Sequence, residues 1–410
     1  MFYRSKERLP EKTALGAQAP YSNKAPEGRA LLAELGNIVR VFRTRRLILE
    51  FDKIPFYFND LSRKRLFNWF LTESSCRLKM PFVLGYPTLF QIEPTNQCNL
   101  RCPMCYTAAD NRSRDSMTFE KFRQVIDQIG DYTLLLQLWG WGEPFMNKDF
   151  CKMIRYAKSK QMKIITSTNG HFLKSEHDID EVIDSKLDVL MFALDGLNAE
   201  TYEKYRRQGD FGRTMTALKL LIRRKKERHA GFPLVNLRML VTRDNEAQAD
   251  QMIAFGKEIG ADVLTFKTLW NINMNANIET LLPENPAYRR AQYAKDGEVI
   301  RIPNSCRRAW NNPVVYRDGT IVPCYFHSGD YSMGNIFSGG RLGFCRAWFG
   351  WKYTKMRLQF IRRRLPDLCS KCVLNFAPVD RFASHAFWYH PHPESFDSAM
   401  SFRPNSQSGG

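Results

Sequence analysis

The amino-acid sequence predicts an α/β protein built around a parallel sheet, and this prediction depends on two observations. Apolar runs of strand length recur at Tyr86–Thr95, Thr133–Trp139, Lys163–Thr168, Val189–Leu194, Val235–Val241 and Val263–Thr268. Amphipathic helical segments separate them, for example at Thr118–Ile129, Lys148–Ser159, Thr214–Arg228 and Glu246–Ile259. Strands that are apolar on both faces and alternate with helices are typical of a parallel sheet that those helices cover.

Composition indicates a reducing compartment and an anionic partner or surface. The 61 Lys and Arg residues outnumber the 42 Asp and Glu residues, which leaves a formal net charge of +19. No recognisable nucleic-acid module accompanies this charge, so we expect no nucleic-acid partner. Residues 1–24 lack the apolar segment of a secretory signal, and no apolar run is long enough to cross a membrane. We therefore expect a cytoplasmic protein, with peripheral contact to an anionic membrane as one interpretation of the charge.

The chain before the predicted sheet divides into two parts. Residues 1–30 are polar and basic, and we expect a disordered arm there. Residues 31–85 mix Arg and Lys with aromatic and aliphatic side chains at helix-like intervals, which predicts amphipathic helices with a break near Pro55 and no strands. Two interpretations stay open, because such helices either lie on an anionic membrane or pack on the main domain.

Three cysteines directly after the first predicted strand point to a metal cluster. Cys98, Cys102 and Cys105 follow the pattern C-x3-C-x2-C. Thiolates are the usual ligands of iron–sulfur clusters, and a complete set has four, so three leave one iron open. The alternative is a structural zinc site, but zinc sites pair C-x2-C with a second pair or with His, and neither lies nearby.

The segment IEPTNQCNLRCPMCY resembles the cofactor loop of the radical S-adenosylmethionine (SAM) family. This resemblance implies a partial (β/α)6 barrel, here over residues 86–290, and a [4Fe-4S] cluster whose open iron binds SAM. It also implies that an external electron donor such as flavodoxin or ferredoxin reduces the cluster, which then cleaves SAM to a 5′-deoxyadenosyl radical.

Three further strand ends resemble the SAM-binding motifs of that family. Gly140-Trp141-Gly142-Glu143-Pro144 follows the second strand, Thr168-Asn169 ends the third, and Asp195 with a trailing Arg206 follows the fourth. Alternatives without SAM binding remain, namely a loop-ordering role for Glu143, a simple Asn-Gly turn at Asn169 and a solvated helix arginine at Arg206. The SAM contacts that the resemblance implies are Met104, Trp141, Gly142, Glu143, Pro144, Thr168, Asn169, Asp195 and Arg206.

A second cysteine set follows the predicted barrel. Cys306, Cys324, Cys369 and Cys372 follow the pattern C-x17-C-x44-C-x2-C, with a hairpin predicted at Asp318-Gly319. Four thiolates complete a [4Fe-4S] cluster, although a zinc ribbon is the alternative. Residues 291–380 resemble the twitch form of the SPASM domain, with cysteine spacing like that of the aminocyclitol dehydrogenase of the butirosin pathway, and residues 381–410 form a tail.

The function that the resemblance implies is that of a radical SAM oxidoreductase. Such an enzyme abstracts a substrate hydrogen and passes an electron to the auxiliary cluster. We expect a non-peptide substrate that is a small molecule or is lipid-like, and we expect residues 270–299 to cross the barrel mouth. The alternatives are a maturase that modifies a peptide or protein, and a non-catalytic iron–sulfur protein at a membrane surface.

Overall fold

The structure is a computed structural model that describes residues 37–108, 112–269, 280–289, 306–326, 331–370, 372 and 383–394. The arm expected at residues 1–30 lies outside these ranges, as does most of the linker expected at residues 270–299. Among the described residues, no helix is both long and apolar enough to cross a membrane.

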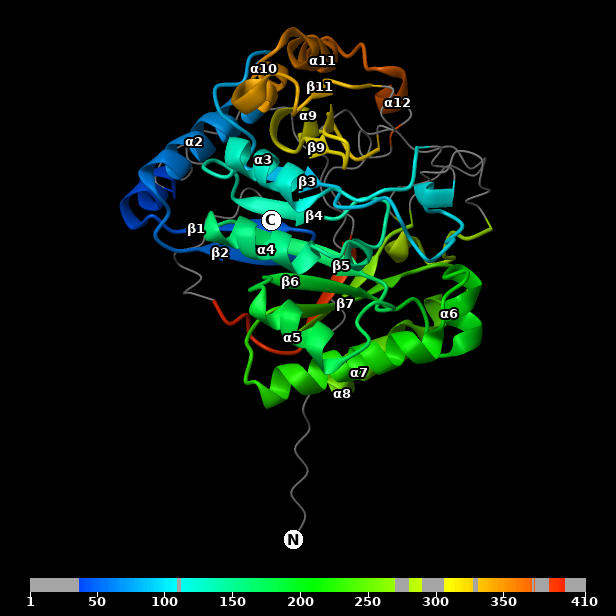
Figure 1. The fold of residues 1–410 in the computed structure, drawn as a ribbon. Coiled ribbons are helices and arrows are strands. Elements are labelled where there is room, and N and C mark those ends of the chain that lie inside the picture. The colour runs from blue at the N-terminus through cyan, green and yellow to red at the C-terminus, as the bar shows by residue number, and fades with distance from the viewer. Residues whose placement is uncertain are drawn as a thin grey trace.

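A ten-stranded sheet with the order β11-β10-β9-β3-β4-β5-β6-β7-β8-β12 forms the centre of the molecule (Figure 1). Six consecutive strands of this sheet, from β3 to β8, are parallel to one another. They are β3 (Leu89–Ile92), β4 (Leu135–Leu138), β5 (Lys163–Thr168), β6 (Val189–Ala193), β7 (Leu234–Leu240) and β8 (Val263–Lys267). The predicted fold class is confirmed, since each of the six apolar runs matches one of these strands, β7 beginning one residue before its run.

Helices cover one face of this parallel sheet. They are α3 (Phe119–Ile129), α4 (Phe150–Ser159), α5 (Glu176–Asp184), α6 (Ala199–Tyr205), α7 (Phe211–Glu227) and α8 (Ala249–Ile259). In α3 the side chains of Phe122, Val125, Ile126 and Ile129 are buried, at the spacing that places them on one face of a helix. They pack with alternate strand residues such as Ile164 and Leu190 in the largest hydrophobic cluster. We call the sheet surface that faces away from these helices its inner face.

A β-hairpin, and not the expected helix, covers part of the inner face. The helical prediction is wrong for residues 47–58, which form β1 (Leu47–Phe51) and β2 (Ile54–Phe58), paired antiparallel. The physical reason is that burial alternates with period two, since Ile54, Phe56 and Phe58 are buried while the residues between them are only partly buried. These side chains pack with inner-face residues that include Val189 and Leu234.

Two other segments of the N-terminal region are helical, as expected. Residues 37–44 are helical, and α2 spans Arg63–Arg77 after an N-cap at Ser62. The side chain of Arg65 donates to the carbonyl oxygen of Gly130 at 2.6 Å and to that of Gln161 at 2.8 Å. Helix α2 therefore packs on the main domain, which is the second of the two interpretations of this region.

The chain after the barrel extends the same sheet. The predicted hairpin is confirmed as β9 (Val314–Val315) and β10 (Thr320–Val322), and β9 pairs parallel with β3. Strand β11 (Gly334–Asn335) and the helices α9 (Arg308–Asn311), α10 (Gly343–Trp348), α11 (Trp351–Ile361) and α12 (Asp367–Ser370) complete this region. Helices α10 and α11 are separated by a break at Phe349 and Gly350.

The described part of the C-terminal tail adds an edge strand. Strand β12 (Ala383–Trp388) pairs antiparallel with β8, which the sequence pattern did not predict. Single turns of 3-10 helix are η1 (Tyr106–Ala108), η2 (Pro144–Met146), η3 (Glu246–Gln248), η4 (Pro286–Tyr288) and η5 (Gly340–Leu342).

Candidate functional site

A cavity of about 230 Å³ collects most of the predicted site residues. Cys98, Cys102 and Cys105 all line it, although they come from a loop and not from a strand. Of the nine predicted SAM contacts, Met104, Trp141, Gly142, Glu143, Thr168, Asn169, Asp195 and Arg206 also line this cavity. Pro144 stands beside them at the start of η2. Parallel strands bring their carboxyl ends to one edge, which explains why motifs from four strands meet here.

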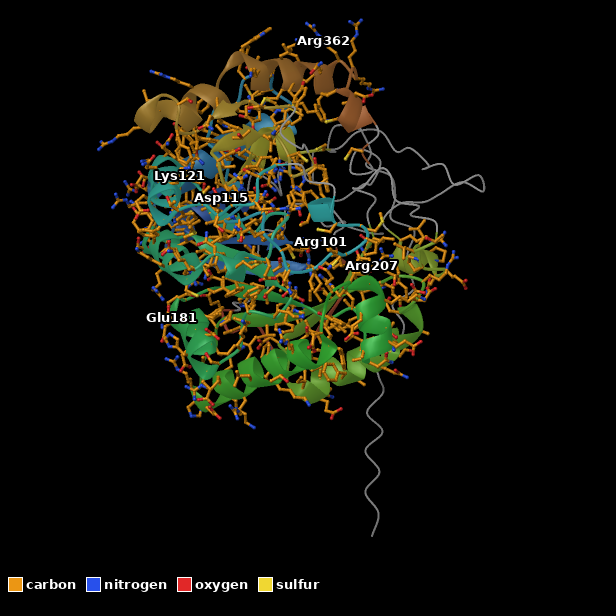
Figure 2. All side chains as sticks on the ribbon, turned by 45° about the vertical axis from the view of Figure 1, so that its right-hand side comes forward. Arg101, Asp115, Lys121, Glu181, Arg207 and Arg362 are labelled. Atoms are coloured by element: carbon orange, nitrogen blue, oxygen red, sulfur yellow. The ribbon has the colours of Figure 1, made fainter. Side chains whose placement is uncertain are left out.

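The loop with the three cysteines is held by its own backbone and by a neighbouring loop. The amide of Leu100 donates to Cys98 Sγ at 3.4 Å, and the amide of Cys105 donates to the carbonyl of Cys102 at 3.1 Å. The amide of Arg101 donates to the carbonyl of Arg207 at 2.9 Å, and Figure 2 shows these two residues close together. The turn therefore keeps its shape through contacts that do not use the thiols as donors.

The thiols are disposed to ionise only when a cation compensates them. Burial raises the pKa of Cys98 to about 12 and that of Cys102 to about 11. Bound metal ions deprotonate coordinating thiols, so iron held by these three cysteines would supply that positive charge. Within the described ranges, no three His, Cys, Asp or Glu side chains are already gathered as a metal cage. The donor type and the shared cavity fit an iron–sulfur cluster, whose binding has to draw the thiols together.

Glu143 joins the loop after β4 to the loop after β5. Its Oε1 accepts from Thr168 Oγ1 at 2.9 Å and from the amide of Phe145 at 3.3 Å, and its Oε2 accepts from the amide of Asn169 at 2.8 Å. Burial raises its pKa to about 7. The carboxyl group thus orders the loop, which was the alternative to SAM binding, and it also lines the cavity.

Gly142 allows the same loop to approach the cysteine loop. A Cβ atom added at Gly142 would lie 2.5 Å from the carbonyl oxygen of Thr95 and 2.6 Å from that of Gln97. The backbone amide of the next residue, Glu143, donates to the backbone carbonyl oxygen of Gln97 at 2.7 Å. Only glycine leaves room for these main chains to run so close together.

Arg206 is not a solvated helix arginine, which was the alternative to SAM binding. Its side chain is 19% exposed, and its Nε donates to Asp195 Oδ2. Asp195 is fully buried and accepts a second bond from the amide of Leu240 at 2.7 Å. The Nη1 atom of Arg206 lies 3.9 Å from Cys102 Sγ. A fixed cation therefore stands beside one of the cluster thiols, and a guanidinium is suited to binding a carboxylate.

Asn99 and Tyr325 are among the residues of this site that were not predicted from the sequence. Asn99 lies between the cysteines, and its Oδ1 accepts from Asn169 Nδ2 at 2.9 Å. Tyr325 stacks on Trp141 with ring centroids 4.1 Å apart, and its hydroxyl donates to the carbonyl of Gly140 at 3.3 Å. The position of Tyr325 directly after Cys324 is the signal that could have found it.

The second cysteine set converges in space across a long stretch of sequence. Burial, and then the thiols of Cys324, Cys306 and Cys372, raise the pKa of Cys369 well above its ordinary value. The thiol of Cys369 therefore lies near enough to the other three thiols for each of them to influence it. The amide of Cys372 donates to the carbonyl of Cys369 at 3.3 Å, which fixes the last C-x2-C turn.

Comparison with protein families identifies both regions. Residues 92–256 match the model of the radical SAM superfamily, and residues 306–373 match the SPASM iron–sulfur cluster-binding domain. The two matches contain all seven cysteines of the two predicted sets.

Several known proteins resemble this chain. The tungsten-containing aldehyde ferredoxin oxidoreductase cofactor-modifying protein of Pyrococcus furiosus is 25% identical over 70% of this chain and 87% of its own. The antilisterial bacteriocin subtilosin biosynthesis protein AlbA of Bacillus subtilis is 24% identical over 60% of this chain and 56% of its own, so the match spans about half of that relative.

Among solved structures, Streptococcus suis SuiB bound to precursor peptide SuiA covers 85% of this chain and 83% of its own, with a TM-score of 0.53 and 14% identity. That likeness concerns the fold alone. With the sheet order, the three-thiol cavity and both family matches in agreement, the chain belongs to the radical SAM superfamily, as an enzyme that uses SAM with a [4Fe-4S] cluster and carries a SPASM domain for auxiliary iron–sulfur binding.

Proposed function

We propose that this enzyme is an oxidoreductase that acts on a small, polar, non-peptide substrate. The observation that carries the proposal is that a single cavity is lined both by the three cluster thiols and by polar side chains of the inner face, among them Gln91, Gln137 and Arg238. Phe51 and Asp52 of the β1–β2 hairpin line the same cavity. The lining also holds apolar side chains such as Met191 and Leu240, so the cavity suits a small molecule that carries polar groups on an apolar frame.

The two cysteine sets have different roles in this proposal. Cys98, Cys102 and Cys105 would hold the SAM-binding cluster, and Cys306, Cys324, Cys369 and Cys372 would hold the auxiliary cluster with no open iron. When bound, these groups supply a radical that removes a hydrogen atom from the substrate, and an acceptor for the electron that the substrate then loses. An external reductant, such as flavodoxin or ferredoxin, completes the cycle.

The protein's own side chains orient SAM and order the loops around it. Glu143 and Asn169 present a carboxyl and an amide group to the cavity, and Arg206 presents a guanidinium that Asp195 holds in place. We propose that these groups bind the amino and carboxylate groups of SAM, together with Met104, Trp141, Gly142, Pro144 and Thr168.

A second candidate function is the maturation of a peptide. It is favoured by the resemblance to AlbA, which is named as a bacteriocin biosynthesis protein. The expected absence of strands before the barrel is wrong, because β1 and β2 are present, and pairing with a strand is one way in which proteins bind peptides. Apolar side chains of this hairpin pack on the inner face, however, so they are not available to bind a peptide. This arrangement favours the small-molecule proposal. Membership of an enzyme superfamily leaves the non-catalytic alternative without support.

Anaerobic reconstitution tests the assignment of the two cysteine sets. The wild-type chain should bind about eight irons, and Cys102→Ala and Cys369→Ala should each retain about four. Cys369→Ala should still form 5′-deoxyadenosine from SAM and dithionite, whereas Cys102→Ala should form none. Cys151→Ala, in helix α4, is the matched control and should retain all of the iron. Full iron content in Cys369→Ala would contradict the auxiliary site.

Fractionated cell extract distinguishes the two substrate classes. A low-molecular-mass fraction resistant to protease should increase 5′-deoxyadenosine formation by the holoenzyme. If only a protease-sensitive fraction has this effect, the enzyme is a peptide maturase.

A further inference from the structure

The tip of the N-terminal hairpin reaches the substrate cavity. Asp52 and Lys53 connect β1 to β2, and both have positive φ, 54° and 65°, as a tight two-residue hairpin turn requires. Phe51 lies beside Trp139, with ring centroids 6.1 Å apart, and the Asp52 side chain is 2% exposed. A segment that precedes the barrel in sequence thus supplies a carboxylate to the cavity of the cluster thiols.

Arg238 of β7 holds this carboxylate in one orientation. Its Nη1 donates to Asp52 Oδ2, and its Nε donates to Thr265 Oγ1 at 3.1 Å. When the Asn236 amide is turned to satisfy both of its groups, its oxygen accepts from Arg238 Nη2 at 3.1 Å. Every nitrogen of the guanidinium therefore has a partner, and the charge of Arg238 compensates that of Asp52.

One oxygen of Asp52 has no such partner. Within the described ranges, Oδ1 is buried and accepts no hydrogen bond. A buried carboxylate oxygen without a donor is costly, and native proteins rarely leave one so. The hairpin nevertheless keeps this oxygen without a donor, in a turn that places two L-residues in the left-handed region. Because the oxygen belongs to a residue that lines the cavity, a bound molecule is the natural source of the donor.

We propose that Asp52 Oδ1 accepts a hydrogen bond from a hydroxyl or amino group of the substrate, so that the N-terminal hairpin is part of the substrate site. This inference rests on the proposed function, because it assigns the cavity to a small polar substrate. It narrows that substrate to a molecule with a hydroxyl or amino group. Asp52 acts here as a binding and positioning group, with its direction set by Arg238.

Three ring compounds of one size test the inference with the reconstituted, SAM-bound full chain. Cyclohexanol and cyclohexylamine carry a donor, whereas cyclohexanone carries only an acceptor. Isothermal titration should show the two donors binding at least about tenfold more tightly than the ketone, since a hydrogen bond to a charged group contributes on that scale. Equal affinities, or no binding of any of the three, would overturn the role of Asp52. This comparison needs no variant, so it decides the matter even if a variant fails to fold.

Asp52→Asn sharpens the test, because it retains one oxygen for Arg238 and replaces the unpartnered oxygen with an amide donor. Cyclohexylamine affinity should fall about tenfold and cyclohexanone affinity should rise. Lys53→Asn, in the same turn but exposed, is the matched control and should retain the wild-type order. An unchanged order in Asp52→Asn would refute the inference. Formation of 5′-deoxyadenosine from SAM and dithionite, without added substrate, separates the two failures. If the wild type forms none, the proposed function is contradicted. If the wild type forms it but does not prefer the donor compounds, only the role of Asp52 is contradicted.

Discussion

The cavity is bounded by two regions that the chain builds in different ways. At the carboxyl ends of the strands, each site residue follows its strand within a few positions, as Gly142 follows β4 and Asn169 follows β5. At the other region, the hairpin 47–58 crosses from the N-terminal side of the chain and packs on strands far along the sequence. The first region is specified by local motifs, whereas the second depends on packing against strands that are distant in sequence.

The largest expected effect comes from a substitution in the second region, the hairpin 47–58. Phe56→Ala removes a fully buried ring from the inner face and should lower the free energy of unfolding by about 3–5 kcal/mol, through lost burial and a cavity. Urea denaturation followed by circular dichroism measures the change. Phe67→Ala on α2 removes a ring that is 58% exposed and should change stability by less than about 0.5 kcal/mol. Similar losses in both variants would mean that the hairpin does not pack as described.

The next effect disturbs the first region. Gly142→Ala pushes a Cβ atom against the carbonyls of Thr95 and Gln97. Overpacking of this kind costs about 1–3 kcal/mol, and SAM affinity of the reconstituted enzyme should fall about tenfold or more. Equilibrium dialysis with labelled SAM measures the loss. Gly231→Ala meets only a side-chain atom at 3.9 Å and serves as the control. Unchanged affinity in Gly142→Ala would show that the two loops need not approach so closely.

Glu143, in the first region, should make the affinity for SAM depend on pH. Burial raises the pKa of this carboxyl to about 7, so the group is neutral below that pH and charged above it. If it binds the SAM ammonium, SAM affinity should rise by up to about tenfold between pH 6 and pH 8, because only the carboxylate attracts the cation. Glu143→Gln should remove this rise, and Glu120→Gln on the exposed side of α3 should not. A rise that persists in Glu143→Gln would restrict Glu143 to ordering the loop.

These contrasts also explain what could be predicted from sequence. The six parallel strands and the motifs at their ends were predictable, because apolar strands and the short segments after them are local patterns. Residues 47–58 were not, since the basic, helix-like segments on both sides extended the helical interpretation across a run whose only basic residue is Lys53. Tyr325 and Asp52 were missed for a related reason. Each enters the site through a partner far away in sequence, Trp141 for the first and Arg238 for the second.

The smallest effect concerns the outward side of the N-terminal region, where membrane contact stays a prediction. With the hairpin side chains turned inward, the apolar groups left for a membrane include Leu78, Phe82 and Leu84 beside the basic Arg77 and Lys79. Phe82 is 63% exposed.

If this segment touches a bilayer, Phe82→Ser should weaken binding to vesicles that contain phosphatidylserine by about 1 kcal/mol, or a few-fold, because one partly inserted ring is lost. Co-sedimentation at low and at high salt measures it, and the basic residues nearby predict that salt weakens binding in both proteins. Thr118→Ser, at the N-cap of α3, retains the cap and should sediment as wild type does. Equal sedimentation of wild type and Phe82→Ser would leave the charge of +19 without a membrane explanation in this segment. The outward side of the region would then be a solvated surface, and the hairpin on its inward side would be the part with a function.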